Sequence, residues 1–362
     1  MYKIKLSTFV IILVCTCLLS CNKNTTEIKS AKHDILFGAI RWDGWVGSKG
    51  TWQIGPIVER TLGPAKFHYR APFFSVIKSE DSILIDGTTQ EIMDKELIYA
   101  KDAGIDYWAY CWYPDGCGLE TARKLHQTSQ YAESVNWCVV LGAFHENVNN
   151  SFGIELVNDF ARQNYQKVLD GRPLVYLYSS DLTRADLNKL REMSMANQIK
   201  SPYVVVMDWH AQTATDYCNE IGADAISSYA TLGENNKPFA EIIPDQSIKN
   251  WEAYSSKKEM VPWVCTGWNP TPRMESENPW SKYYSDATNC QDAKPQDLKD
   301  FLLSAIEWTN LNKMKARANT IIIYAWNEHD EGYGAICPTL GENNLPNTER
   351  LDAISSAIYS KK

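Results

Sequence analysis

Short runs of β-branched and aromatic residues alternate with segments of helical periodicity from residue 35 onward. Eight of these runs have the length of strands, and several are apolar throughout, which is typical of strands covered on both faces. The predicted strands span residues 36–41, 107–111, 138–143, 174–178, 203–208, 225–229, 261–266 and 321–326. Strands that alternate with helices in this way predict βα units around a parallel sheet.

The predicted helices lie between these strands and several have recognisable ends. The first begins at Thr88, where Glu91 completes a capping box, and ends at Gly104. The others are expected at residues 119–128, 153–166, 184–197, 213–221, 244–256 and 295–318. Residues 44–88 separate the first strand from its helix, and we expect them to form a hairpin beside the mouth of the sheet.

Eight strands in one uninterrupted run predict an α/β fold, a single (β/α)8 TIM barrel with an extended first βα loop, over residues 34–362. An open doubly wound sheet is the structural alternative. No GxGxxG motif follows the first strand, where a dinucleotide-binding fold would place it. No fixed-period repeat or Gly/Ser-rich linker divides the pattern, so we expect one domain.

The first 21 residues have the pattern of a lipoprotein signal peptide. Two lysines precede an apolar segment at residues 9–19, and Leu18-Leu19-Ser20-Cys21 forms a lipobox. The apolar segment is shorter than the about 20 residues of a spanning helix, although an uncleaved membrane anchor is the alternative. We therefore expect lipidation of Cys21, a polar leash at residues 22–33, and a domain anchored in a bacterial cell envelope, facing the periplasm or the cell surface.

Composition narrows the choice of ligand. The net charge is −8 and no Lys/Arg cluster is present, so nucleic acid and anionic lipid are poor partners and a neutral substrate is expected. The 13 Trp and 19 Tyr residues often stand beside polar residues, which favours a carbohydrate because their rings stack on sugar faces; a Trp-rich core is the alternative. Past Cys21 the cysteines are odd in number and lack CxxC spacing, which argues against a zinc ribbon, but Cys111 and Cys117 are close enough to pair.

Polar and aromatic residues follow most of the predicted strands, at the end where a barrel builds its active site. The tryptophans among them are candidates for stacking on sugars, and the polar residues are candidates for binding sugar hydroxyls. An arginine at this rim can anchor a loop or bind a carboxylated sugar. The candidates for substrate binding are Trp42, Asp43, Trp112, His145, Glu146, Asp208, His210, Tyr229, Trp268, Arg273, Asn327 and His329. For each of them, a rim residue satisfied by local hydrogen bonds is the alternative.

The last predicted strand leads directly into the segment WNEHDEG, which brings several titratable groups to one rim. Glycoside hydrolysis uses two carboxyl groups, one that protonates the leaving oxygen and a second that acts as nucleophile or base. Glu328 and Glu331 are three residues apart across a turn and can face one substrate from two directions. Crowding is expected to raise the pKa of one of them, which then serves as the acid. A hydrated acidic helix start is the alternative.

Three motifs together resemble glycoside hydrolase family 99 and its WbsX-like, family 71/99-like relatives: GIDYWAYCWY at the second predicted strand, GWNPTPR after the seventh and WNEHDEG after the eighth. The order of these motifs covers most of the barrel, and the last one is the most specific. The resemblance implies a (β/α)8 fold and a retaining, endo-α-mannanase-like hydrolysis through a 1,2-anhydro sugar. It implies that Glu328 takes the proton of the sugar 2-hydroxyl and that Glu331 is general acid, then base. His329 stands where this family usually has Trp, so the sugar pocket is expected to differ.

Two other functions are compatible with the sequence. A metal-dependent barrel hydrolase is one, because several rim residues are metal-ligand types, namely His145, Glu146, Asp208, His210, His329 and Asp330. The first predicted strand lacks the His-x-His of amidohydrolase barrels, and we expect neither a metal nor another cofactor. The second is a non-catalytic glycan-binding lipoprotein, which would keep the aromatic rim without needing both glutamates.

Overall fold

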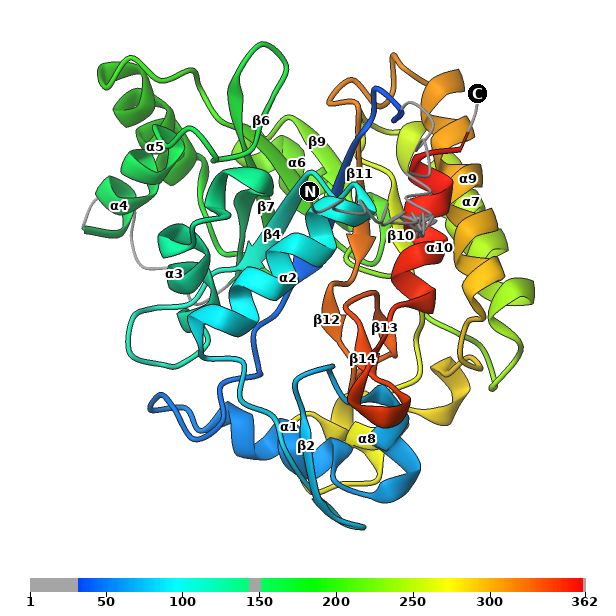
Figure 1. The fold of residues 1–362 in the computed structure, drawn as a ribbon. Helices are drawn as coiled ribbons and strands as arrows, with labels where there is room; N and C mark the ends of the chain where they lie inside the picture. Colours follow the sequence, from blue (N-terminus) through cyan, green and yellow to red (C-terminus); the bar gives the residue numbers. More distant parts are fainter. Residues whose placement is uncertain (1–31, 143–150, 361–362) are drawn as a thin grey trace, which may run out of the picture.

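Eight parallel strands follow one another around a nearly closed ring in the computed structural model, which describes residues 32–142 and 151–360 (Figure 1). Their order is β10, β11, β1, β4, β5, β7, β8 and β9, and one bridge between Ile226 and Met260 joins β9 to the segment before β10. The predicted single (β/α)8 barrel is therefore confirmed, and the alternative of an open doubly wound sheet is wrong. The strands are β1 (Leu36–Arg41), β4 (Tyr107–Cys111), β5 (Asn136–Leu141), β7 (Arg172–Tyr178), β8 (Tyr203–Met207), β9 (Ala225–Ser227), β10 (Trp263–Cys265) and β11 (Thr320–Tyr324).

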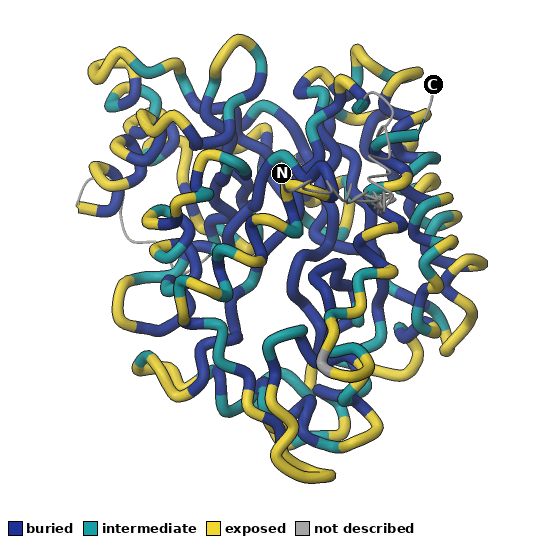
Figure 2. The backbone as a smooth tube through the Cα atoms, viewed as in Figure 1, coloured by how far each residue is buried: buried dark blue, intermediate teal, exposed yellow. Residues whose placement is uncertain are grey.

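Large side chains fill the barrel interior, and one of them fits only because its neighbour is glycine. A Cβ atom on Gly38 of β1 would lie 2.1 Å from the Tyr107 ring, so only glycine leaves room for that ring. The Tyr107 hydroxyl is 2.8 Å from that of Tyr176 and 2.9 Å from that of Thr320. Buried positions run from the strands to the inner faces of the surrounding helices (Figure 2).

The helices pack around the strands with their apolar faces inward, as the periodicity predicts. Several bounds differ by a few residues from those predicted. The helices are α2 (Gln90–Ala103), α3 (Thr121–Thr128), α4 (Ser151–Phe160), α5 (Arg184–Ala196), α6 (Ala211–Ile221), α7 (Phe239–Ser255), α9 (Pro295–Leu311) and α10 (Glu349–Ile358), the last of which was not predicted.

The start of α2 corrects one detail of the sequence analysis. The capping box expected at Thr88 and Glu91 is wrong, because the Thr88 hydroxyl instead donates to Asp86 (2.6 Å). Thr89 is the N-cap and accepts a hydrogen bond from the backbone N–H of Ile92. The predicted end at Gly104 is confirmed, since this glycine has the left-handed conformation (φ 87°) of a helix C-terminus.

Residues 44–88 do more than form a hairpin, because a helix that the sequence analysis missed comes first. Val58 and Leu62, one turn apart on this helix, are buried. In Figure 1, this insert lies at the end of the barrel toward which β11 points. Its elements are α1 (Ile54–Leu62), η1 (Ala65–Arg70), β2 (Val76–Ser79) and β3 (Ser82–Leu84), of which β2 and β3 form the expected hairpin.

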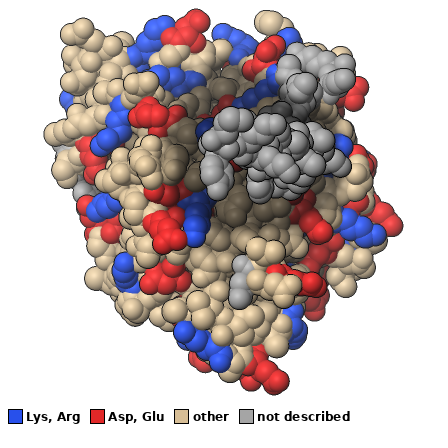
Figure 3. Space-filling view, viewed as in Figure 1, with Lys and Arg blue, Asp and Glu red and all other residues tan. Residues whose placement is uncertain are grey.

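Smaller elements complete the loops. They are η2 (Ala132–Ser134), β6 (Lys167–Val168), α8 (Thr271–Met274), η3 (Ser281–Tyr283), η4 (Asp286–Thr288), β12 (Asn327–Glu328), β13 (Gly334–Ala335), β14 (Thr339–Leu340), η5 (Glu342–Asn344) and β15 (Pro346–Asn347). Acidic and basic side chains are intermixed on the face shown in Figure 3.

The predictions for the N-terminus, including lipidation of Cys21, fall outside the described residues except for the last two residues of the leash. These two pack on the domain instead, since Lys32 contacts Asp106 at 2.5 Å and His33 is buried. Across residues 32–142 and 151–360, no helix has the length and apolar character needed to cross a bilayer. The pairing of Cys111 with Cys117 is wrong, because both thiols are free. The Cys111 thiol lies 3.6 Å from the Tyr229 hydroxyl, whereas that of Cys117 contacts Glu120 at 3.4 Å.

The burial of His126 in α3 predicts that the stability of the fold depends on pH in a specific way. Its buried ring lies 3.1 Å from the Tyr110 hydroxyl and 3.0 Å from the Val135 carbonyl oxygen, and burial lowers its pKa to about 4. The unfolded chain takes up this proton near the ordinary histidine pKa of about 6.5, so stability is complete above that pH and falls as pH decreases toward 4. The loss from this one group is expected to be on the order of 3 kcal/mol.

The measurement compares urea unfolding of wild type and His126→Asn between pH 7 and pH 4. The other titrating groups are common to both proteins, so they cancel in the difference between the two free energies of unfolding. The variant is expected to be less stable at pH 7, and the gap should narrow as the pH falls. A gap that is constant over this range would mean that His126 does not titrate differently in the folded protein.

Candidate active site

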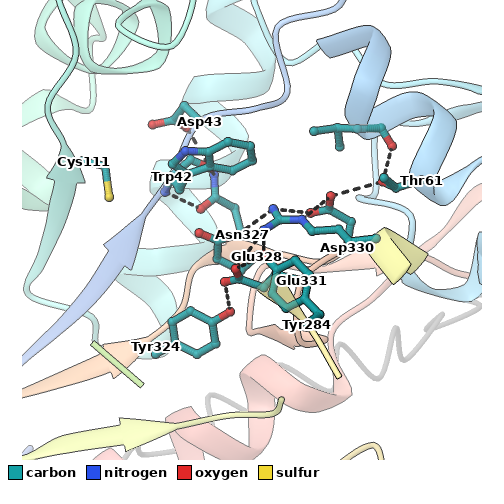
Figure 4. A network of polar contacts seen from close by, with 12 residues as sticks. Trp42, Asp43, Thr61, Cys111, Tyr284, Tyr324, Asn327, Glu328, Asp330 and Glu331 are labelled. Atoms are coloured by element: carbon teal, nitrogen blue, oxygen red, sulfur yellow. Dashed lines mark hydrogen bonds and ion pairs between the residues drawn. The ribbon is translucent and has the colours of Figure 1, made fainter. Parts of the chain in front are cut away.

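Three acidic residues of the segment after β11 bind one guanidinium at the rim (Figure 4). Arg273 of α8 contacts Asp330 through two atoms, with Nε at 2.8 Å from Oδ2 and Nη2 at 2.9 Å from Oδ1. The same guanidinium lies 2.8 Å from Glu331 Oε1 and 3.2 Å from Glu328 Oε2. Charge-assisted bonds of this kind fix both the position and the orientation of their partners. Two carboxyl groups predicted to be catalytic are thus brought together by one cation.

Arg273 has no hydrogen-bond donor left for a sugar carboxylate. A guanidinium has five N–H groups, and the contacts to Glu328, Asp330 and Glu331, with one to the Tyr284 hydroxyl (2.9 Å), use all five. The residue is also only 4% exposed. The proposed contact of Arg273 with a carboxylated sugar is therefore corrected, whereas its role as a loop anchor agrees with the structure.

Glu331 is the most open of the three acidic side chains, at 13% exposed compared with 4% for Glu328 and 3% for Asp330. Besides Arg273, the Tyr284 hydroxyl donates to its Oε1 at 2.6 Å and the Tyr324 hydroxyl donates to its Oε2. The carboxyl group is therefore held from both oxygens while its edge remains accessible.

Glu328 has a different environment from Glu331. Its Oε1 accepts a hydrogen bond from the Tyr229 hydroxyl (3.3 Å), which places the predicted pocket residue Tyr229 at the site. Burial, followed by the negative charge of Glu331, raises the pKa of Glu328 well above its ordinary range. The prediction that one of the two glutamates has a raised pKa is confirmed, but burial is the larger cause, and the residue is not the one to which the family resemblance gives the acid role.

Asn327 joins the segments after β1 and β11 rather than facing a substrate. Its Oδ1 accepts from the Trp42 backbone N–H at 2.9 Å, while its Nδ2 donates to the Trp42 carbonyl at 2.7 Å and to Asp43 Oδ1 at 3.2 Å. The same oxygen of Asp43 accepts from Arg41 Nε at 2.7 Å. Burial raises the pKa of Asp43 to about 6. The prediction of a sugar contact is corrected for Asn327, whose amide oxygen and nitrogen are both used within the protein.

His329 lies behind the site, so the prediction that it binds the sugar is wrong. It is 1% exposed, and its ring packs edge-on against Trp45 with 4.9 Å between the ring centroids. Burial lowers its pKa to about 3, so the ring is neutral. Its neighbour Asp330, which also accepts from the Thr61 hydroxyl (3.1 Å), serves to hold Arg273.

The three tryptophans predicted to stack on sugars have different environments. Trp112 is 8% exposed and packs on Phe152 at 4.6 Å, and Trp268 is 5% exposed and packs against Trp209 and Tyr324 at 5.6 and 5.8 Å. These two residues are buried beneath the rim, so the prediction that they stack on sugars is wrong. Trp42 is half-buried and lies over Arg273, at 5.1 Å from its ring centroid to Cζ.

The remaining candidates are not joined to the acidic cluster. Asp208 Oδ1 accepts from the His210 backbone N–H at 2.9 Å, in the turn before α6, and the His210 side chain is exposed. His145 and Glu146 fall on residues 143–150, outside the described residues. Among residues 32–142 and 151–360, no set of three or more His, Cys, Asp or Glu side chains is arranged to hold a metal ion.

Three aromatic residues at the site were not predicted. Tyr324 is a strand residue whose hydroxyl donates to Glu331, and its position directly after three isoleucines was a weak signal for a polar group at the strand end. Tyr284 and Trp280 come from the segment between α8 and α9, and the Trp280 ring lies 4.8 Å from Arg273 Cζ. No local pattern marks these two residues, because only the path of that segment over the rim places them there.

Comparisons with known proteins give a likeness of fold. No family model matches the chain, and no curated protein matches it. Among solved structures, a GH99 endo-alpha-mannosidase from Bacteroides thetaiotaomicron has a TM-score of 0.55 and 16% identity, covering 89% of this chain and 96% of that one. The same type of enzyme in complex with bis-tris-propane gives a TM-score of 0.55 and 16% identity, with 89% and 95% covered. The arrangement of the whole barrel is therefore shared with these structures.

Proposed function

We propose that this protein is a glycoside hydrolase whose acid and base are Glu328 and Glu331. The observation that carries the proposal is the pair of carboxyl groups held on one guanidinium at the strand ends, with tyrosine hydroxyls on both. Two carboxyl groups beside one another are what glycoside hydrolysis requires. The likeness of fold to a GH99 endo-alpha-mannosidase and the WNEHDEG motif support the same reaction class.

The finer proposal is a retaining reaction through a 1,2-anhydro sugar, with an endo-α-mannanase-like specificity. Glu328 takes the proton of the sugar 2-hydroxyl, whose oxygen then bonds to the anomeric carbon while Glu331 protonates the leaving oxygen. Glu331 next removes a proton from water, which bonds to the anomeric carbon as Glu328 returns its proton to the 2-oxygen. A base with a raised pKa accepts a proton more strongly once ionised, which suits Glu328 for the first step.

The experiment is a screen of the protein against yeast α-mannan and plant and host polysaccharides, with product mass and anomeric configuration recorded by NMR. We expect release of oligosaccharides with retained configuration. The rate is expected to be unchanged by a chelator, because the proposed reaction uses only the two glutamates and water. Loss of hydrolysis with chelator would favour the metal-dependent alternative.

A substrate analogue that lacks the 2-hydroxyl at the cleavage point separates the finer proposal from the coarser one. Without that oxygen the anhydro sugar cannot form, so the analogue is expected to bind without being cut. Its hydrolysis, or a product of inverted configuration, would contradict the anhydro mechanism and leave a glycosidase of another kind. Absence of hydrolysis on every glycan would contradict the proposed function itself.

A further inference from the structure

Four aromatic side chains form a continuous row along the rim, which we call the aromatic track: Trp280, Trp42, Tyr113 and Trp52. The rings of Trp280 and Trp42 are 5.5 Å apart between centroids. The Trp42 indole N–H donates to the Tyr113 hydroxyl at 2.9 Å, and the rings of Tyr113 and Trp52 are 5.7 Å apart. These residues come from segments after β1, β4 and α8, so only the folded barrel brings them into a row.

The inner end of the aromatic track lies at the acidic cluster. The rings of Trp42 and Trp280 are 5.1 and 4.8 Å from Cζ of Arg273, the residue that binds Glu328 and Glu331. The outer end lies at the surface, since Trp52 is 38% exposed, and the three residues before it are half-buried. A ligand that follows the track therefore runs from the proposed cleavage point toward solvent.

The geometry of the track fits a glycan better than a flat or charged ligand. Two of the three adjacent pairs of rings are nearly perpendicular, at 86° both between Trp42 and Trp280 and between Trp52 and Tyr113. A flat aromatic ligand needs parallel faces on which to stack, whereas the units of a sugar chain can turn from one ring face to the next. The cation at the inner end, Arg273, has all of its N–H groups bound by the protein, so it offers nothing to a polyanion.

We propose that the aromatic track binds consecutive units of a neutral polysaccharide that extends from the cleavage point across the rim, so that the protein cuts within chains. This inference rests on the proposed function and adds to it a binding surface and a preference for long substrates. Trp52, at the outer end, determines affinity for units distant from the bond that is cut and takes no part in the acid–base chemistry.

The test compares wild type with Trp52→Ala on short and long α-mannan oligosaccharides, or on oligomers of another neutral glycan if the screen identifies one. One stacking contact contributes about 1 kcal/mol, so kcat/KM on long oligomers is expected to fall by roughly fivefold to tenfold. The value for oligomers too short to reach Trp52 should not change. Tyr131→Ala is the control, because this half-buried residue precedes β5 and lies at the opposite end of the barrel from the strand ends.

Retention in a gel containing yeast α-mannan, or the glycan identified by the screen, supplies a readout that needs no hydrolysis. Trp52→Ala in a Glu331→Gln background should be retained less than Glu331→Gln alone. Equal kcat/KM values for wild type and Trp52→Ala at every oligomer length would contradict the proposed role of the track and leave the proposed function intact. Equal retention of Glu331→Gln with and without Trp52→Ala would do the same. Absence of both hydrolysis and retention in wild type would overturn both proposals. Retention without hydrolysis would overturn the proposed enzyme and the cutting within chains, and would leave the track as a binding surface.

Discussion

Replacing Glu328 or Glu331 with glutamine is expected to lower kcat on the glycan identified by the screen by about 10²- to 10⁴-fold, the range for loss of a general acid or base. Glutamine keeps the size of the side chain and can still accept a hydrogen bond, but it cannot exchange a proton. Binding of the glycan in the Glu331→Gln variant should be retained, because this residue acts on the glycosidic oxygen. The measurement is initial rate and glycan affinity on the same preparations.

Glu307→Gln is the matched control. Glu307 is exposed on α9, so this substitution makes the same chemical change away from the rim. It is expected to match wild type in rate and in melting temperature. A folded Glu331→Gln variant with full hydrolysis would remove that residue from the mechanism. Full hydrolysis by both variants would mean that the active site lies elsewhere in the protein.

The pH dependence of the hydrolysis rate is a further test of the roles of Glu328 and Glu331. The first step needs Glu328 ionised as base while Glu331 is protonated as acid, so the pair must hold one proton. Because the pKa of Glu328 is raised, activity should fall on the alkaline side, at a pH above the ordinary glutamate range, where the pair loses that proton. The residual activity of Glu331→Gln needs only ionised Glu328, so it should rise through an acidic limb and show no alkaline limb. That acidic limb should lie below the alkaline limb of wild type, because the charge of Glu331 no longer raises the pKa of Glu328. An alkaline limb that persists unchanged in Glu331→Gln would contradict this assignment.

Replacing Arg273 with methionine is expected to reduce the free energy of unfolding by about 3–5 kcal/mol, the cost of removing one partner of a buried ion pair. The variant retains a side chain of similar length but leaves Glu328, Asp330 and Glu331 without their common cation. Urea unfolding at pH 8 measures the loss. Hydrolysis should also be lost, since the two glutamates no longer have a fixed position.

The loss of stability in Arg273→Met should be smaller at pH 5 than at pH 8. The guanidinium lowers the pKa of Glu328, so its removal raises that folded-state pKa further. A folded-state pKa above the unfolded value means that the folded protein takes up protons first, and stability is recovered as the pH falls. Arg317→Met is the control, because its contact with Glu259 at 3.4 Å is exposed on the Arg317 side (56%) and such pairs contribute roughly 0–1 kcal/mol. Equal losses for both variants would mean that the Arg273 cluster is not a buried network.

The sequence by itself determined the βα pattern and the eight strands, because a strand covered on both faces needs an unbroken apolar run and a helix needs an apolar face of period 3.6. It also determined which rim carries Glu328 and Glu331, since residues that follow parallel strands meet at one end of a barrel. These are properties of local patterns, and they could be read without knowing any distant contact.

Only the tertiary structure decided how the rim residues are used. His329 and Trp268 look like ligand-binding residues in sequence, yet they are buried because neighbouring segments pack over them. Arg273, Tyr284 and Trp280 reach the WNEHDEG segment through loops whose path has no periodic signal. Burial and partners depend on residues far apart in the chain, and for that reason the division between catalytic, positioning and core residues appears only once the barrel has closed.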